Sequence, residues 1–161
     1  MKLKNYPKAI VSLENALKEF NSLEGAQMRS GSFKALYNLG ICYRNVNNLD
    51  DSVKRFENAI QIPGGAKAAA YNNLGLSNFQ RHHYKQSIAE FSKAIEMSDG
   101  QVAVHYNNRG LALYHIDKDQ VALEDFSKAI ALNANDPNVL FNRGNVYLHL
   151  SKFDEAREDF D

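Results

Sequence analysis

Four asparagines recur along the chain at nearly equal intervals, and their side chains suit the recognition of a peptide backbone. The spacing is 35 residues from Asn38 to Asn73, 35 from Asn73 to Asn108 and 34 from Asn108 to Asn142. An asparagine amide offers an acceptor oxygen and two N–H donors, so it can bond an N–H and a C=O group of an extended peptide. A row of such amides could hold a peptide with little regard to its sequence. The alternative is that each amide bonds to its own scaffold.

Polar and aromatic side chains flank these asparagines and are further candidates for a peptide site. The candidates immediately before an asparagine are Tyr37, Asn72 and Asn107. The candidates six or seven residues after an asparagine are Arg44, Tyr114, His115 and His149. Few of these side chains carry a charge, so the sequence predicts a polar and aromatic binding surface.

Two arginines form a second pattern with two aspartates. Arg109 and Arg143 directly follow the last two asparagines, at a position where the first two copies have leucine. An aspartate lies sixteen residues after each arginine, at Asp125 and Asp159. This co-occurrence predicts two structural ion pairs, and the alternative is an anion-binding site at the arginines.

No constellation of residues for catalysis or metal binding is found in the sequence. His115 and His149 lie one repeat apart, which is roughly 10 Å if their helices pack side by side. That separation is too large for one metal ion, whose bonds to histidine are about 2.0 Å long. Zinc-ligand spacings, phosphate loops and nucleophile elbows are absent. We therefore expect no enzyme activity, no metal and no cofactor, and we interpret Cys42 as a small buried residue.

A longer repeat predicts the elements that position the asparagines. Each asparagine is followed two residues later by a glycine, at Gly40, Gly75, Gly110 and Gly144. Twelve residues after the glycine stands a small residue, at Ser52, Ser87, Ala122 and Ala156. Sixteen residues after it stands a phenylalanine, at Phe56, Phe91, Phe126 and Phe160. The two small residues let a pair of antiparallel helices approach closely, and the phenylalanine fills the space beside them.

This pattern resembles the tetratricopeptide repeat family over about residues 33 to 161. The resemblance implies an all-α fold, a right-handed α-solenoid of antiparallel helix pairs. It also implies that the first helix of each pair lines a concave face, where the asparagines and their flanking residues would form the peptide-binding groove. The sequence departs from the family in lacking a proline near most repeat ends, since only Pro137 lies at such a boundary.

We expect one array over residues 1–161. Residues 1–20 are predicted to form the second helix of a partial repeat, and 21–32 an irregular link. Full repeats are expected at 33–66, 68–101 and 103–136, followed by an incomplete repeat at 137–161. Because both ends resemble cuts through a repeat, we interpret the chain as a fragment of a longer array or as one whose ends a partner covers.

Charge and composition bound the class of partner. The chain has 19 Lys and Arg residues against 19 Asp and Glu residues, so its formal net charge is zero. That balance gives no reason to expect nucleic acid or an anionic membrane as the partner. A single cysteine and the lack of an apolar run of about 20 residues favour a reducing, cytoplasmic location.

The favoured function is a scaffold that binds an extended or helical peptide segment of another protein. One alternative is a substrate-presenting repeat arm of a larger, glycosyltransferase-like enzyme, because the asparagine row resembles the ladder in O-linked N-acetylglucosamine transferase. A second alternative is self-association through uncapped end helices. A carboxylate clamp of the kind found in some chaperone-binding repeat proteins is not expected. That clamp needs a lysine at the place of Tyr37 and an asparagine at the place of Ile41. It also needs a lysine and an arginine at the places of Val104 and Asn108.

Overall fold

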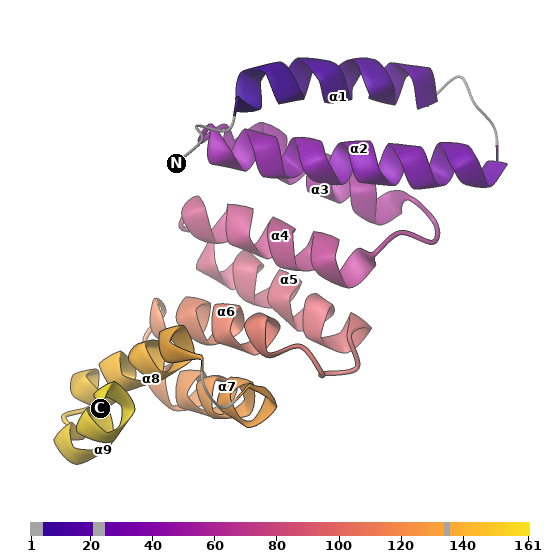
Figure 1. Ribbon diagram of the computed structural model, residues 1–161. Helices are drawn as coiled ribbons and strands as arrows, with labels where there is room; N and C mark the ends of the chain where they lie inside the picture. The colour runs from indigo at the N-terminus through magenta and orange to yellow at the C-terminus, as the bar shows by residue number, and fades with distance from the viewer. Residues whose placement is uncertain (1–4, 21–24, 134–135) are drawn as a thin grey trace. The chain divides into compact units, whose positions relative to one another are not determined.

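The computed structural model describes residues 5–20, 25–133 and 136–161, and within them all regular structure is α-helical. Residues 1–4, 21–24 and 134–135 of the expected array lie outside this description. The all-α helical repeat fold is thereby confirmed (Figure 1). The helices are α1 (Tyr6–Phe20), α2 (Gly25–Asn45), α3 (Leu49–Gln61), α4 (Lys67–Gln80), α5 (Tyr84–Met97), α6 (Ala103–Tyr114), α7 (Asp119–Leu132), α8 (Pro137–His149) and α9 (Phe153–Phe160).

The helices fall into two compact units, which we call unit 1 (Met1–His82) and unit 2 (His83–Asp161). In unit 1, α1 packs on α2, α2 on α3 and α3 on α4. In unit 2, each helix from α5 to α9 packs on the next one in the chain. We call α2, α4, α6 and α8, which carry the four asparagines, the A helices, and α1, α3, α5, α7 and α9 the B helices.

The link predicted as irregular at 21–32 is wrong for residues 25–32, because α2 already begins at Gly25. Glycine and serine in this segment are weak helix formers, which is why the sequence favoured a link. Packing overrides that preference. A Cβ atom at Gly31 would lie only 2.5 Å from the ring of Phe20 on α1, so a glycine allows α1 to lie close against this turn of α2.

Each turn between an A helix and its B helix contains one residue in the left-handed region of backbone space. The residues and their φ angles are Asn47 (59°), His82 (60°), Asp117 (56°) and Ser151 (58°). They are spaced by 35, 35 and 34 residues, the same intervals as the asparagines. Asparagine and aspartate tolerate this conformation better than most residues. The backbone conformation of these turns therefore repeats with the sequence, including at the two turns where the left-handed residue is histidine or serine.

The close approach of A and B helices depends on glycine facing phenylalanine. A Cβ atom at Gly40 would lie 2.7 Å from the ring of Phe56, and one at Gly110 would lie 2.9 Å from the ring of Phe126. Both rings are completely buried, and so are the small residues Ser52 and Ala122. These contacts hold the A helices at a constant distance from the B helices within each unit.

Candidate functional site

In unit 1 the two repeated asparagines differ in exposure and in the hydrogen bonds that their side chains make within the protein. Asn38 on α2 is exposed, and its side chain makes no hydrogen bond within the described part of the chain. Asn73 on α4 is half-buried, and its Nδ2 donates to the Tyr37 hydroxyl at 2.9 Å and to the Ala69 carbonyl at 2.9 Å. Both N–H groups of Asn73 are therefore satisfied internally, which leaves its Oδ1 as the group for a ligand.

In unit 2 the repeated asparagines are more enclosed. Asn142 on α8 donates from Nδ2 to the Asn107 Oδ1 on α6 at 2.9 Å. Asn108 is only 8% exposed, in contrast to its interpretation as a residue of the peptide-binding groove. In both units the later asparagine bonds to the residue just before the earlier one, Tyr37 or Asn107. The row thus links neighbouring A helices, as the scaffold alternative anticipates for Asn73 and Asn142.

Arg44 lies on α2 in unit 1 and contacts α4. Its Nη1 donates to the backbone carbonyl of Asn73 at 3.3 Å. Burial lowers the pKa of the Arg44 guanidinium, and the nearby Tyr37 partly opposes this effect. No carboxylate pairs with Arg44 within the residues that the structure describes, so its charge remains unneutralised by the scaffold.

Asn72 does not belong to the accessible surface, in contrast to its interpretation as a peptide-binding residue. It is 9% exposed, whereas its neighbour Asn73 is half-buried. Successive residues of an α-helix point about 100° apart, which places Asn72 and Asn73 on different sides of α4. In unit 1 the candidates that remain accessible are Tyr37, Asn38, Asn73 and Arg44.

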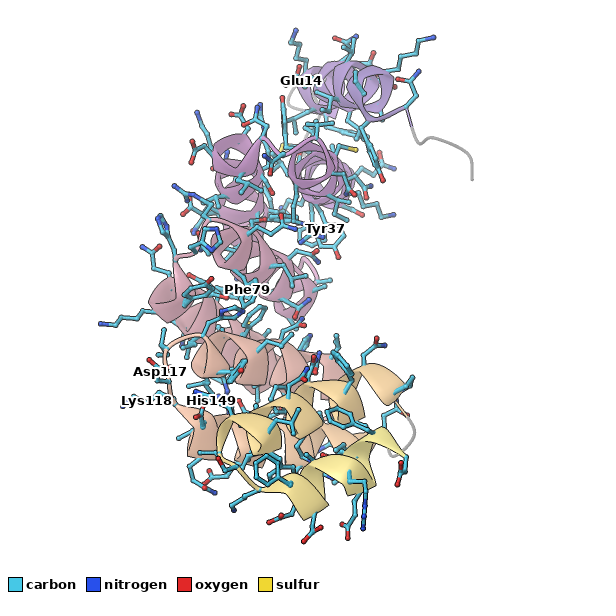
Figure 2. All side chains as sticks on the ribbon, turned by 90° about the vertical axis from the view of Figure 1, so that its left-hand side faces the viewer. Glu14, Tyr37, Phe79, Asp117, Lys118 and His149 are labelled. Atoms are coloured by element: carbon cyan, nitrogen blue, oxygen red, sulfur yellow. The ribbon has the colours of Figure 1, made fainter. Side chains whose placement is uncertain are left out.

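The aromatic and histidine candidates of unit 2 gather where α6 and α8 end. The His115 ring stacks on Tyr84 with centroids 4.7 Å apart, and Tyr114 meets His149 edge-on at 5.7 Å. His149 Nδ1 lies 2.8 Å from the Asp119 Oδ2, and Figure 2 shows His149 near the α6–α7 turn that bears Asp117 and Lys118. These contacts occupy one edge of His149 and leave half of its side chain exposed.

Sequence reasoning missed Asp119 and Tyr84 as partners of the histidines. A signal was present for Asp119, because it replaces the large residue found at this place in the other copies, namely Leu49, Tyr84 and Phe153. No sequence signal pointed to the contact of Tyr84 with His115, since these residues lie on a B helix and on the next A helix.

The structure brings each predicted arginine–aspartate pair together. Arg109 Nε and Nη2 donate to the two carboxylate oxygens of Asp125, both at 2.7 Å, and Nη1 donates to the Ser92 hydroxyl at 3.1 Å. Arg143 repeats this arrangement with Asp159 and Ser127. Hydrogen bonding to the aspartates raises the pKa of both arginines, with burial acting in the opposite direction. These guanidiniums are thereby already paired.

Two kinds of feature are not found in the described residues. They contain no group of three or more histidine, cysteine or acidic side chains placed to hold a metal ion. None of the helices in the described ranges has both the length and the apolar character that crossing a bilayer requires.

Comparison with sequence families identifies the repeat in two places. Models of the tetratricopeptide repeat match residues 68–100 and residues 126–158. No protein of curated function has a significant sequence match to the chain.

Solved structures with the same fold include several repeat proteins. BtubC from P. vanneervenii is 22% identical with a TM-score of 0.87, and the match covers 98% of this chain and 71% of BtubC. MamA (41-end) from Desulfovibrio magneticus RS-1 is 20% identical with a TM-score of 0.75, over 98% of this chain and 90% of that one. The second TPR of Spaghetti (RPAP3), bound to the HSP90 peptide SRMEEVD, is 28% identical with a TM-score of 0.57. That match covers 59% of this chain and 87% of the Spaghetti chain.

Proposed function

Since this chain belongs to the tetratricopeptide repeat family, a family of protein–protein interaction modules, we propose that it binds an extended polypeptide segment of another protein along the A helices of unit 1. The main support for this proposal is Asn38 on α2. Its side-chain amide is exposed and makes no hydrogen bond within the described part of the chain. The half-buried Tyr37 and Arg44 lie on the same helix, and the free Oδ1 of Asn73 comes from α4. Together they offer N–H donors and an acceptor to a peptide backbone.

A structural relative supports this proposal. The Spaghetti repeat domain is held in complex with a peptide, which shows that a related helical array can present a peptide-binding face. The peptide in that complex is acidic at its end, whereas this chain has Tyr37 and Ile41 at places where a carboxylate clamp needs lysine and asparagine. A different set of contacts is therefore needed here, and Asn38 and Arg44 are the candidates.

The test is a selection of short random peptides on the whole chain, followed by affinity measurement with two matched variants. Asn38→Ala removes the proposed contact, and Asn58→Ala removes an equally exposed asparagine on the B helix α3. We expect Asn38→Ala to lose about 0.5–1.5 kcal/mol of binding free energy, or about 2- to 13-fold in affinity. Asn58→Ala should bind as the parent does. Equal affinity of both variants would contradict the proposal.

Self-association is a second candidate function, because unit 2 exposes large aromatic side chains on its last two helices. Phe141 is 59% exposed, Phe153 is 67% exposed and Phe160 is 44% exposed. Exposed apolar side chains of this size commonly mark protein contacts. Light scattering across a range of concentrations, with Phe141→Ser and Phe153→Ser as the variant, tests this candidate. A mass that stays monomeric at all concentrations in the parent chain excludes it.

A further inference from the structure

The charges of the described helices are sorted by helix type. The A helices contain six cationic residues and no acidic residue, the cations being Arg29, Lys34, Arg44, Lys67, Arg109 and Arg143. The B helices contain fourteen acidic and eight cationic residues. The net charge of zero thus conceals a segregation in which the A helices are positive and the B helices negative.

Among the described residues, the A-helix cations without a carboxylate partner all lie in unit 1. In unit 2, Arg109 and Arg143 are paired with Asp125 and Asp159. In unit 1, the four cations of α2 and α4 have no carboxylate partner within the described residues, and they are Arg29, Lys34, Arg44 and Lys67. The positive potential available to a ligand therefore concentrates on α2 and α4.

A cavity of about 470 Å³ lies at the first half of α2 in unit 1. One wall is formed by Arg29, Ser30, Phe33 and Lys34, and the other by the α3–α4 turn, Pro63, Gly64, Gly65 and Ala66. Gly65 and Phe33 lie in close contact across the cavity wall, because a Cβ atom at Gly65 would lie 2.3 Å from the present position of the Phe33 ring. Among the residues that the structure describes, no acidic side chain lines the cavity, so its two cations face a space that suits an anion.

The cavity and Arg44 lie along one helix, with Asn38 between them in sequence. Lys34 and Arg44 are ten residues apart, which is about 15 Å along the axis of an α-helix. An extended peptide covers this length in about five residues. A half-buried guanidinium such as Arg44 forms stronger charge-assisted bonds with a carboxylate than a fully hydrated one does.

We propose that the polypeptide segment bound by unit 1 is acidic, with one carboxylate in the cavity of Arg29 and Lys34 and another, about five residues away, at Arg44. This inference rests on the proposed function and names the chemistry of its partner. The peptide backbone between the two carboxylates then lies against Asn38. Complementary charge of this kind selects the partner and speeds its association.

The test uses the whole chain and three fluorescent peptides of one length in an anisotropy titration. The first carries two glutamates about five residues apart, the second has glutamines and the third has lysines at the same places. We expect the glutamate peptide to bind at least about tenfold more tightly than the glutamine peptide and to weaken as salt is added, since salt screens charge pairs. The lysine peptide should not bind.

Two charge-matched variants locate the site. Arg29→Gln with Lys34→Gln should remove most of the preference for glutamate. Lys54→Gln with Lys128→Gln, on exposed positions of the B helices α3 and α7, changes the net charge equally and should leave the preference unchanged. Far-UV thermal melts check that both variants remain folded.

Three outcomes would overturn the inference. These are equal binding of the glutamine peptide, an equal loss in the control variant, and tighter binding of a single-stranded oligonucleotide than of the glutamate peptide. If the glutamine peptide binds equally while Asn38→Ala still weakens it, the acidic preference is wrong and the proposed function stands. If none of the peptides binds and the random selection yields no binder, the proposed function fails as well.

Discussion

Unit 1 and unit 2 use the same helix-pair repeat but connect their helices with different polar groups. In unit 1, the Ser52 hydroxyl donates to the Gly40 carbonyl at 2.8 Å and lies 2.8 Å from the Ser77 hydroxyl. In unit 2, the corresponding small residue is Ala122, and the polar link is the two-pronged pair of Arg109 with Asp125. The pair α2 and α3 is thus linked by neutral hydroxyl groups, whereas the pair α6 and α7 is linked by charges.

This difference has consequences for both stability and function. A buried charge left without its partner is far more costly than an unpaired hydroxyl group. Arg109 and Arg143 of unit 2 are paired within the scaffold, whereas the cations of α2 and α4 in unit 1 have no carboxylate partner among the described residues. The same repeat therefore yields one unit with an internal charge network and one with an available positive surface.

The largest expected effect comes from breaking the charged link in unit 2. Arg109→Leu installs the residue found at the same repeat position in unit 1, Leu39, and leaves Asp125 unpaired at 4% exposure. We expect a loss of about 3–5 kcal/mol in unfolding free energy, measured by chemical denaturation.

The matched control for this loss is Arg55→Leu in unit 1. Arg55 pairs with Glu14, which Figure 2 labels on α1. The Glu14 side chain is 38% exposed, so removal of Arg55 should cost less than about 1 kcal/mol. The Arg109→Leu/Asp125→Ala double variant should recover part of the loss. Equal losses for Arg109→Leu and Arg55→Leu would show that burial of the aspartate is not the cause.

The next effect concerns the glycine–phenylalanine contacts. The phenylalanine ring is fully buried in one of them and partly exposed in another. Gly110→Ala forces a Cβ atom against the fully buried Phe126 ring and should destabilise the chain by about 1–3 kcal/mol. Gly144→Ala meets the Phe160 ring, which is 44% exposed and can swing away. There the better helix propensity of alanine, about 1 kcal/mol, should make the change neutral or favourable. Thermal melts of the two variants that shift equally would contradict this distinction.

A pH dependence should distinguish the units. His105 on α6 is 5% exposed, and burial lowers its pKa from the ordinary 6.5, partly offset by a hydrogen bond involving the Ala94 backbone. The unfolded chain therefore binds this proton more readily than the folded chain. Stability is fully present above about pH 6.5 and falls as pH drops toward the lowered pKa, by at most about 1.4 kcal/mol per pH unit.

Hydrogen exchange of the α6 and α3 amides across this pH range measures the effect. Protection of α6 should fall in acid, while α3 of unit 1, whose described residues include no buried histidine, should change less. His105→Gln should abolish the difference between the two helices. Persistence of the acid effect in that variant would assign it to another group.

The smallest effect is expected from making unit 1 resemble unit 2 at the small-residue position. Ser52→Ala removes the bond to the Gly40 carbonyl, but Ser77 keeps its own bond to the Asn73 carbonyl at 3.0 Å. Because the remaining hydroxyl stays satisfied, we expect a loss of about 0.5–1 kcal/mol, measured by chemical denaturation. A loss as large as that of Arg109→Leu would mean that the hydroxyl link is as critical as the charged one.

The sequence by itself determined the helix pairs, because they depend on side chains of given sizes that recur at constant intervals. Glycine, a small residue and phenylalanine at constant offsets can satisfy close packing in only one antiparallel arrangement, and the structure has that arrangement at Gly40 and Gly110. The arginine–aspartate pairing was also deducible, since Arg109 and Arg143 each appear together with an aspartate at one offset.

Only the tertiary structure decided which side chains remain for a ligand. Helical periodicity gives the direction of a side chain, but it does not give its reach across to a neighbouring helix. The sequence therefore treated Asn38, Asn73, Asn108 and Asn142 alike, although packing encloses Asn108 and engages Asn73 with Tyr37. Likewise, α7 supplies the carboxylate of Asp125 to Arg109, whereas Arg44 on α2 has no carboxylate partner among the described residues. That choice depends on the contacts between helices, because each charge or amide has several candidate partners and the packed fold selects one.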